Sequence, residues 1–284
     1  MAVVGSRVKQ VDSIQTGTVA VKARQREGRG PGRLRLFNTL RDAGWTDPLP
    51  IYAWVIQHVE GTIVVDTGET ARAMEPGYFP RWHPYFRLAL RESVKPEDEV
   101  GPSLERLGIA PDEVRWVVLT HLHTDHAGGI AYFPASEIIV SRREFDAASG
   151  FRGKLSGYLP HRWPSNFSPR LLDFEPQPFG PFSASVALTD AGDVRLVATP
   201  GHSVGHLSVV VEEDDHFLFF AGDASYTEEL MIRQVVDGVT PDAAAARETI
   251  AGIRRFAEEA PLVYLPSHDP ASAARLRARQ TVNL

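Results

Sequence analysis

The sequence contains no cysteine in its 284 residues, although it contains ten histidines. Without cysteine the chain forms no disulfide, and thiolate zinc sites, iron–sulfur clusters and cysteine nucleophiles are excluded as well. Any metal ion that this chain binds must therefore be held by nitrogen and oxygen ligands.

Long apolar runs are missing too. Nowhere do roughly 18 apolar residues follow one another, as a membrane-spanning helix would require. The stretch from Met1 to Arg7 also lacks the apolar core of a secretory signal. We therefore expect a soluble, cytoplasmic protein without a membrane partner.

An excess of positive charge is absent from the chain as a whole. With 30 basic and 36 acidic residues it has a formal net charge of −6, which disfavours a nucleic-acid partner. The exception is segment 22–35, in which six basic residues accompany Glu27. Two alternatives are a patch for anions or nucleic acid and a solvated loop, and Pro31 with its neighbouring glycines favours the loop.

Composition and hydrophobic period indicate an ordinary globular protein. Apolar residues make up 43% and charged residues 23%, and the length suits one large domain or two small ones. Helical spacing predicts helices over 96–107 and over 240–259, the second with Thr240 as its N-cap. Strands and helices alternate in both halves, which indicates a layered α/β or α+β fold. Short apolar runs predict strands at 51–59, 62–66, 115–120, 138–141, 194–199, 207–211, 217–221 and 262–265.

Two segments, 71–91 and 151–182, interrupt this regularity. Irregular connections of this length are uncommon unless they are functional or disordered, and a high aromatic content argues against disorder. The alternatives are that they line a substrate pocket, pack on the core or form a subunit interface. Their aromatic residues are Tyr78, Phe79, Trp82, Tyr85 and Phe86, and then Tyr158, Trp163, Phe167, Phe174 and Phe179.

The strongest motif follows the predicted strand 115–120. In His121-Leu122-His123-Thr124-Asp125-His126, alternation places His121 and His123 on the same side of an extended backbone. Asp125 and His126 follow where the next glycines allow a helix to begin. Buried imidazoles and a carboxylate need partners, and a cation supplies a partner to all of them at once. The motif therefore predicts a metal site.

Three later strand ends offer further ligands. They are His202 in a Pro-Gly turn, Asp223 after Ala221-Gly222, and His268 after Ser267. Each alone is equally compatible with a turn or a cap. Together with the first motif they give seven nitrogen or oxygen ligands, which is too many for one tetrahedral zinc. Two metal ions that share a bridging carboxylate would use them all.

These motifs, from Val64-Val65-Asp66-Thr67-Gly68 to His268, resemble the metallo-β-lactamase-fold hydrolases, whose signature is HxHxDH followed by later His, Asp and His ligands. The resemblance implies an αββα sandwich of two stacked mixed sheets flanked by helices, formed by one domain over 1–284. Asp66 is expected to support the ligand loops. The resemblance also assigns the ligands: His121, His123 and His202 to the first metal, Asp125, His126 and His268 to the second, and Asp223 as the bridge between them.

The residues around Tyr226 resemble one branch of this family in particular. Asp223-Ala224-Ser225-Tyr226 is similar to the N-acyl-homoserine lactonases, the quorum-quenching branch, in which the corresponding tyrosine faces the metals and hydrogen-bonds the substrate. The alternative for Tyr226 is a buried aromatic with a satisfied hydroxyl, and His206 is expected to be structural. The branch implies two divalent ions (zinc, with iron, cobalt or manganese as alternatives), a lactone with an acyl chain as substrate, and a homodimer.

The expected reaction is opening of a lactone ring by a hydroxide that the two metals share. The Tyr226 hydroxyl would polarise the carbonyl, and Asp125 would deliver a proton to the leaving alkoxide. The alternatives within the fold are another lactonase or esterase, a phosphotriesterase and a glyoxalase II-like thioester hydrolase. A metal-binding scaffold without catalysis is the alternative from another class.

Overall fold

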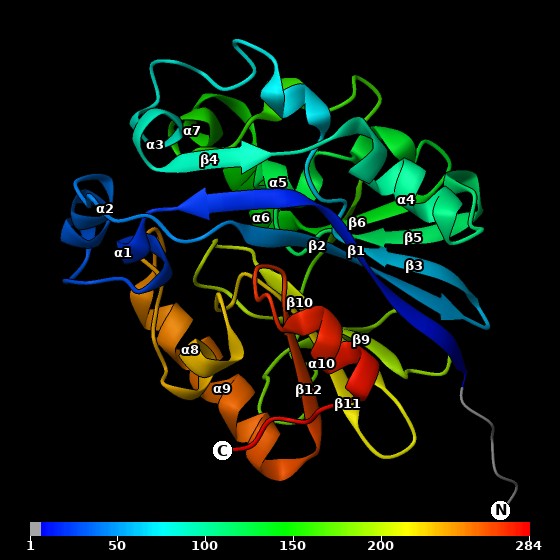
Figure 1. Ribbon diagram of the computed structural model, residues 1–284. Coiled ribbons are helices and arrows are strands. Elements are labelled where there is room, and N and C mark those ends of the chain that lie inside the picture. Colours follow the sequence, from blue (N-terminus) through cyan, green and yellow to red (C-terminus); the bar gives the residue numbers. More distant parts are fainter. Residues whose placement is uncertain (1–6) are drawn as a thin grey trace, which may run out of the picture.

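The computed structural model describes residues 7–284. Residues 1–6, part of the stretch searched for a secretory signal, lie outside the described residues. The chain forms two β-sheets that face each other, with helices on both outer sides (Figure 1). This arrangement confirms the predicted αββα sandwich. Within residues 7–284 no helix is long and apolar enough to cross a bilayer.

Twelve strands build the sheets, within the described residues. Their bounds are β1 Val8–Val21, β2 Leu49–His58, β3 Gly61–Val65, β4 Leu90–Ser93, β5 Val114–Val118, β6 Glu137–Ser141, β7 Arg170–Leu172, β8 Ser185–Ala187, β9 Val194–Ala198, β10 Leu207–Glu212, β11 Phe217–Gly222 and β12 Leu262–Pro266. The first sheet has the order β4-β1-β2-β3-β5-β6-β7 and the second β12-β11-β10-β9-β8. Both are mixed, because β3, β5, β6 and β7 pair in parallel and β11 pairs in parallel with β12.

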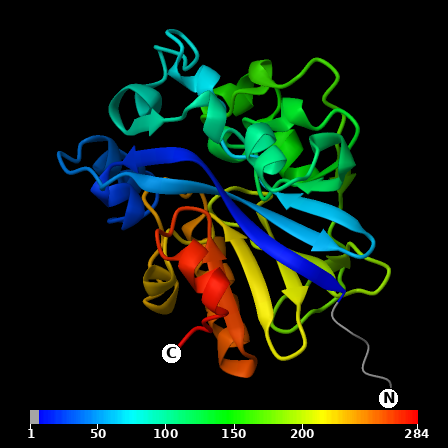
Figure 2. The same cartoon turned by 45° about the vertical axis from the view of Figure 1, so that its right-hand side comes forward.

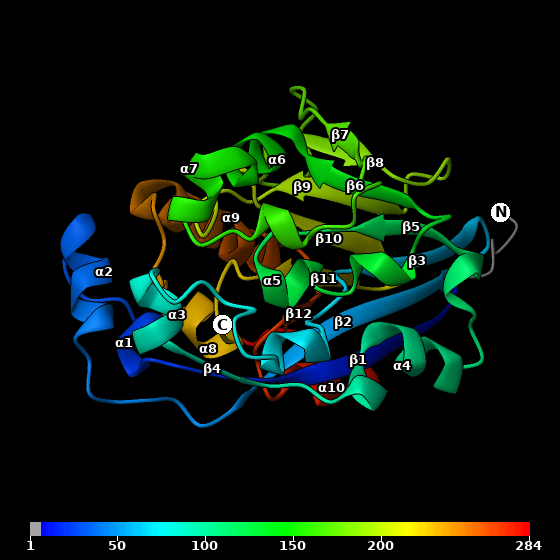
Figure 3. The same cartoon turned by 90° about the horizontal axis from the view of Figure 1, so that it is seen from above.

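The helices cover the outer faces of the sheets and one end of the sandwich (Figures 1 and 2). In Figure 3, α1, α2, α3 and α7 gather at the same end of the molecule. The bounds are α1 Ala23–Arg26, α2 Arg33–Leu40, α3 Pro84–Leu88, α4 Val100–Arg106, α5 Thr124–Ala127, α6 Arg142–Ala148, α7 Gly150–Leu155, α8 Glu228–Ile232, α9 Ala243–Glu259 and α10 Ser272–Ala278. Single 3-10 turns are η1 Ala71–Met74, η2 Pro96–Asp98, η3 Pro111–Glu113, η4 Ile130–Tyr132 and η5 Pro160–Arg162.

The main core lies between the sheets, where side chains of alternating positions from both inner faces meet. The Trp54 ring of β2 contacts the Phe220 ring of β11 with centroids 5.5 Å apart. Two further cores form outside the sheets, one between the first sheet and α4 and one between the second sheet and α9. Burial on both faces explains why the central strands are continuous apolar runs.

All eight predicted strands are confirmed, within two residues at their ends. The predicted hairpin at Glu60-Gly61 joins β2 and β3, with His58 opposite Gly61 and Trp54 opposite Val65. Strand β1 was not predicted, because its polar and glycine residues around Thr16 hide the apolar alternation. It nevertheless pairs along most of its length with β2.

Three local predictions need correction. Segment 22–35 is not a continuous loop, since it contains α1 and the first residues of α2. The helix predicted over 240–259 begins at Ala243, because the Asp242 side chain accepts from two backbone N–H groups and so replaces Thr240 as the N-cap. The helix predicted over 96–107 divides into η2 and α4.

Candidate metal centre and its cavity

The ends of four strands meet at one edge of the sandwich. The turns after β5, β9, β11 and β12 carry the predicted metal ligands, so residues distant in the sequence converge. The seven predicted ligands form three overlapping groups, and within each group the ligand atoms lie within 4.8 Å of one another. The groups are His121, His123 and His202; His121, His126 and Asp223; and Asp125, His126 and His268.

Two turns at this edge need unusual backbone conformations. Asp66 follows β3 with φ 59°, a left-handed conformation that few non-glycine residues adopt. Its carboxylate accepts from the backbone N–H and the hydroxyl of Thr120, both within 3.0 Å. At Gly201, φ is 146° and a Cβ would lie 2.4 Å from the Ala246 backbone, so only glycine lets the turn before His202 pack against α9.

Asp223 lies between the two outer groups. Its Oδ2 is 3.4 Å from Nε2 of His202, and its Oδ1 is 3.3 Å from Nε2 of both His126 and His268. Oδ2 of Asp125 lies 3.4 Å from Nε2 of His268. One carboxylate therefore contacts imidazoles from both groups, which is the arrangement that a bridging ligand requires.

Hydrogen bonds on the far side of the imidazoles orient them. Nδ1 of His126 lies 2.8 Å from Asp66, Nδ1 of His202 lies 3.1 Å from Asp237, and Nδ1 of His268 lies 2.8 Å from the Pro50 carbonyl oxygen. A partner on Nδ1 leaves Nε2 free to face the centre as a metal ligand. The arrangement therefore fixes both the ring orientation and the tautomer that metal binding needs.

The donor set fits divalent cations. Nε2 of His126 and Oδ1 of Asp223 are buried without a hydrogen-bond partner. Burial alone would lower the pKa of His268, but the Asp223 and Asp125 carboxylates raise it to about 10. Burial would raise the pKa of Asp125, yet His126 and His268 hold it at about 2. Closely packed imidazoles and carboxylates of this kind need cations between them.

Glu144 supports two of the turns that carry predicted ligands, a role that no sequence pattern predicts. This buried carboxylate accepts from the Leu122 backbone N–H at 3.1 Å, from the Ser203 hydroxyl at 2.6 Å and from the Gly205 N–H at 3.1 Å. The turns that carry His123 and His202 are thus held by one side chain. Its position is set by α6, which no metal-binding motif predicts.

His206 is structural, as predicted. Its Nδ1 lies 2.9 Å from the Thr199 hydroxyl, and its Nε2 accepts from the Asp223 backbone N–H at 3.1 Å. Burial lowers the pKa of His206 to about 3, so this imidazole is neutral. It joins the turn after β9 to the turn after β11.

A cavity of about 880 Å³ opens onto the predicted ligands. On one side it is bounded by His123, Asp125, His202, Asp223 and His268. On the other side it is bounded by residues from 19–40, 82–92 and 155–158, which we call the entrance wall. Side chains of the entrance wall that face the cavity include Val19, Gln25, Leu36, Trp82, Tyr85, Glu92, Leu155 and Tyr158.

The entrance wall is largely apolar and lacks positive charge. None of the described residues that line the cavity is a lysine or an arginine, whereas Glu92 is among them. A cavity of this size and composition suits an uncharged substrate with an apolar part.

The two aromatic segments differ in where their rings lie. From 71–91, Trp82, Tyr85 and Phe86 line the cavity. From 151–182 only Tyr158 is an aromatic that lines it, while Trp163 and Phe179 pack elsewhere in the cores. The first segment therefore shapes the entrance wall, and most of the second packs on the body of the fold.

Tyr226 lies where the ligands meet the entrance wall. It is buried, its ring stacks on His268 with centroids 5.7 Å apart, and it lines the cavity. Its hydroxyl oxygen accepts from Nε2 of Gln25 at 2.9 Å, and the same amide donates to the Tyr85 hydroxyl at 2.8 Å. Because the oxygen of Tyr226 is an acceptor here, its own hydrogen is available to a substrate.

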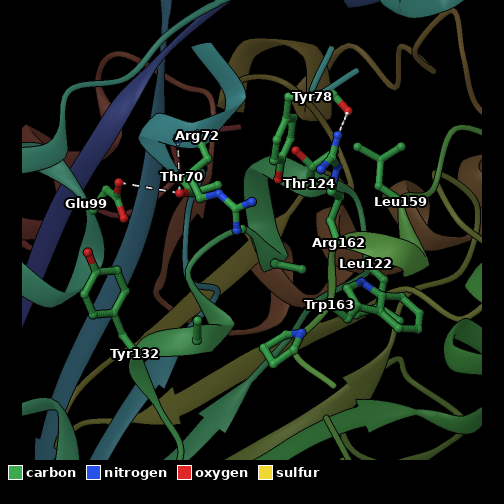
Figure 4. A pocket seen from close by; sticks show the side chains of 14 residues that line it. Thr70, Arg72, Tyr78, Glu99, Leu122, Thr124, Tyr132, Leu159, Arg162 and Trp163 are labelled. Carbon is green, nitrogen blue, oxygen red and sulfur yellow. Dashed lines mark hydrogen bonds between the residues drawn. The ribbon is translucent and has the colours of Figure 1, made fainter. Parts of the chain in front are cut away.

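A second cavity, of about 320 Å³, is lined by part of the turn 121–126 together with residues near 70–78 and 159–164 (Figure 4). Leu122 and Thr124 reach it from that turn, and Arg162 donates to the Tyr78 carbonyl at 2.8 Å beside it. None of the seven predicted ligands lines this cavity. We therefore place the candidate chemistry in the larger cavity.

The basic segment 22–35 contacts the residues that support the candidate metal centre. The buried guanidinium of Arg35 donates to the carbonyl oxygens of Val236 at 3.2 Å and Asp237 at 3.0 Å. Since Asp237 orients His202, this basic segment ties α2 to a support of the candidate metal centre. The Lys22 ammonium lies 4.0 Å from the centre of the Trp45 ring.

Comparison with known protein families shows to which family the chain belongs. Residues 46–268 match the profile of the Metallo-beta-lactamase superfamily, which covers most of the chain and every predicted ligand. The chain belongs to the metallo-beta-lactamase superfamily. This result confirms the resemblance inferred from the HxHxDH motif.

Two curated relatives are each 31% identical to this chain. An N-acyl homoserine lactonase of Bacillus thuringiensis is 31% identical over 229 residues, which cover 78% of this chain and 82% of the relative. A probable metallo-hydrolase of Mycobacterium tuberculosis is 31% identical over 179 residues, which cover 61% of this chain and 56% of the relative.

Solved structures share the fold. An N-acyl homoserine lactone hydrolase with N-hexanoyl-L-homoserine bound at its catalytic metal centre matches with a TM-score of 0.76 and 23% identity, covering 95% of this chain and 96% of that one. A dizinc quorum-quenching lactonase matches with a TM-score of 0.65 and 14% identity, covering 95% and 92%.

Proposed function

We propose that this chain is a metal-dependent hydrolase that opens the lactone ring of N-acyl homoserine lactones. One observation carries the proposal above the others: the seven predicted ligands gather in one place, and five of them border a cavity that Tyr226 and a largely apolar wall also line. The 31% identity to a named N-acyl homoserine lactonase supports the same substrate class.

Two divalent cations, when bound by these ligands, supply a nucleophile from water at neutral pH and polarise the ester carbonyl. In our assignment His121, His123 and His202 would hold one ion, Asp125, His126 and His268 would hold the other, and Asp223 would serve both. Asp66 and Asp237 keep their imidazoles oriented for this task.

Two residues act on the substrate itself. The Tyr226 hydroxyl donates to the carbonyl oxygen as negative charge develops there, while Gln25 holds that hydroxyl in place. Burial raises the pKa of Tyr226, so it remains protonated and able to donate. Asp125 is a carboxylate at rest because its pKa is about 2, so it must take up a proton before it passes one to the leaving alkoxide.

The charged residues that line the cavity help to distinguish between the candidate substrate classes. A glyoxalase II-like thioester hydrolase binds a substrate with carboxylates, which basic residues near the site would favour. The described lining has none and carries Glu92, so it favours a neutral substrate. Neutral phosphotriesters and other lactones or esters remain the alternatives that a substrate panel must separate.

Three finer assignments belong to the same proposal: zinc as the metal, a cytoplasmic location and a homodimer. Zinc suits imidazole and carboxylate ligands. The homodimer is supported by exposed apolar side chains on α2 (Leu34 and Phe37), just before α3 (Trp82) and on α7 (Phe151, 72% exposed). Light scattering of the wild type and of Phe151→Ser would test the dimer, and metal analysis and cell fractionation would test the other two.

A pH-indicator assay tests the function. Metal-loaded protein should release one proton for each N-hexanoyl homoserine lactone that it opens. It should act far more slowly on a matched thioester, phosphotriester and β-lactam. A preference for the phosphotriester or thioester, or no turnover of any homoserine lactone, would overturn the proposal.

A further inference from the structure

The second cavity, unlike the larger one, contains positively charged side chains. Arg72 and Arg162 line it, whereas no lysine or arginine is found among the described residues that line the larger cavity. Glu99 is the one acidic residue in its described lining, and Oε1 of Glu99 already accepts from the Ala71 backbone N–H at 2.9 Å. The second cavity therefore carries an excess of positive charge beside the turn 121–126.

The guanidinium of Arg162 is held in a fixed position by the protein. Its Nη2 donates to the carbonyl oxygens of Gly77 at 2.9 Å and Tyr78 at 2.8 Å, and its central carbon lies 4.6 Å from the centre of the Tyr78 ring. Within residues 7–284, Nη1 donates to no acceptor and no carboxylate pairs with this guanidinium. Since Nε is enclosed by protein atoms and Nη1 is not, Nη1 is the nitrogen that can donate to a ligand.

Two further donors reach the same cavity. Arg72 of η1 is exposed, points toward Arg162 in Figure 4, and forms no ion pair with a described residue. The Tyr78 hydroxyl also has no hydrogen-bond partner in the described part of the chain. Burial and Glu69 raise the pKa of Tyr78, while the charges of Arg162 and Arg72 lower it. The hydroxyl is therefore protonated and lies near both guanidinium groups.

The rest of the lining is mostly apolar. It includes Leu122, Ala131, Leu159, Trp163 and Pro164. In Figure 4, Leu122, Leu159 and Trp163 are drawn on the same side of the view as Arg162. A ligand that uses both parts of the lining has an anionic group for the donors and an apolar body for these side chains.

We propose that the second cavity binds a small organic carboxylate with an apolar body. A carboxylate offers two acceptor oxygens, which suits the paired N–H groups of a guanidinium. Arg72 and Arg162 pair with this group, and the Tyr78 hydroxyl donates to it. Two sources supply such a molecule: a free fatty acid of medium length, and the ring-opened product if the proposed function holds. The site itself does not depend on the proposed function.

Three matched ligands test the site by calorimetry on the metal-loaded protein in low-salt buffer. They are hexanoate, hexanamide and acetate. Hexanamide has the shape of hexanoate without its charge, so it should bind at least about tenfold more weakly. Acetate lacks the apolar body and should also bind more weakly. Added salt should weaken hexanoate binding, because it screens the attraction between charges.

Substitutions in the lining locate the bound hexanoate. Arg162→Met should weaken its binding by about 10- to 100-fold, as expected for a hydrogen bond to a charged group, and the more exposed Arg72→Met by about three- to tenfold. Tyr78→Phe should also weaken binding. Arg87→Met is the matched control, since Arg87 is exposed on α3 and lines neither cavity. Melting temperatures would identify misfolding, and Arg72→Met with Tyr78→Phe completes the test if Arg162→Met does not fold.

Carboxylates also bind metal ions, so the variants decide between the two cavities. Equal affinity for hexanoate in the wild type, Arg72→Met and Tyr78→Phe would overturn the proposal, as would equal binding of hexanamide. Displacement of hexanoate by N-hexanoyl homoserine would identify the reaction product as a ligand of the site, and a lack of displacement would assign the site to free fatty acids. A protein that opens no lactone would still bind hexanoate here, so the two proposals fail separately.

Discussion

The two sides of the cavity are built in different ways. The side formed by the seven predicted ligands, which we call the ligand side, consists of short turns directly after strands of both sheets. Three of its imidazoles have a fixed partner on the outer nitrogen. The entrance wall comes from α1, α2, α3, α7 and β4, at the end of the sandwich away from the main core (Figure 3). Rigid strand ends can hold the geometry that catalysis requires, whereas the peripheral wall can vary with the substrate.

We therefore expect substitutions on the ligand side to abolish catalytic activity, and substitutions in the entrance wall to change which substrates are hydrolysed. The largest effect should follow Asp223→Ala, because this side chain contacts ligands of both groups. Bound cations stabilise transition-state charge by several kcal/mol, so kcat/KM should fall by at least about 10³-fold. Elemental analysis should show fewer metal ions per chain, and full metal content with unchanged turnover would contradict the ligand assignment.

Tyr226→Phe should have the next largest effect, since this residue lies where the two sides meet. Loss of one donor to the developing oxyanion should lower kcat by on the order of 10²-fold with little change in KM. Metal content should equal that of the wild type, because the ring still stacks on His268. Wild-type kcat would remove the hydroxyl from the mechanism.

Metal binding should depend on pH through the ligand side alone. The folded, metal-free pKa of His268 is about 10, above the ordinary value of about 6.5. The charged imidazole therefore stabilises the metal-free fold fully below pH ~6.5, and this contribution is lost as the pH rises through about 10. A cation must displace that proton, so zinc affinity should rise between pH 7 and 9, by up to about tenfold per unit for each proton released.

Zinc titrations in weak buffer with an indicator dye would count the released protons. An affinity that stays flat from pH 7 to 9, with no proton release, would show that His268 does not bind the metal as its neutral imidazole. Trp82→Ser, which leaves the ligand side intact, should keep the wild-type pH dependence.

Trp82→Ser should have the smallest effect on activity, because it changes the entrance wall and leaves the ligand side intact. This side chain lines the cavity but is 56% exposed, so its loss removes part of an apolar contact. We expect KM for a long-chain lactone to rise by about three- to tenfold, with kcat unchanged. Steady-state kinetics on short and long acyl chains would show this, and an equal effect on both lengths would place Trp82 outside the acyl-chain pocket.

The sequence predicted the ligand side far better than the entrance wall. The His121–His126 motif and the later His202, Asp223 and His268 are local patterns at strand ends, and the structure brings them together. Asp237 and Glu144 carry no comparable pattern, because their roles depend on contacts across the fold. Such contacts become visible only when the elements are packed.

The entrance wall was missed for a related reason. Gln25 lies in a segment predicted as a loop, and Glu92 lies on a short edge strand with exposed neighbours. Neither has a sequence signal beyond its polarity. Only the folded structure shows that both residues line the cavity.

If two metal ions are needed to open homoserine lactones, activity must follow metal occupancy. Zinc would be added stepwise to metal-free protein while proton release from N-hexanoyl homoserine lactone is measured. Turnover should rise until two zinc ions are bound per chain and then stay constant. Turnover that is complete at one ion per chain, or absent at two, would show that the two-metal assignment is wrong.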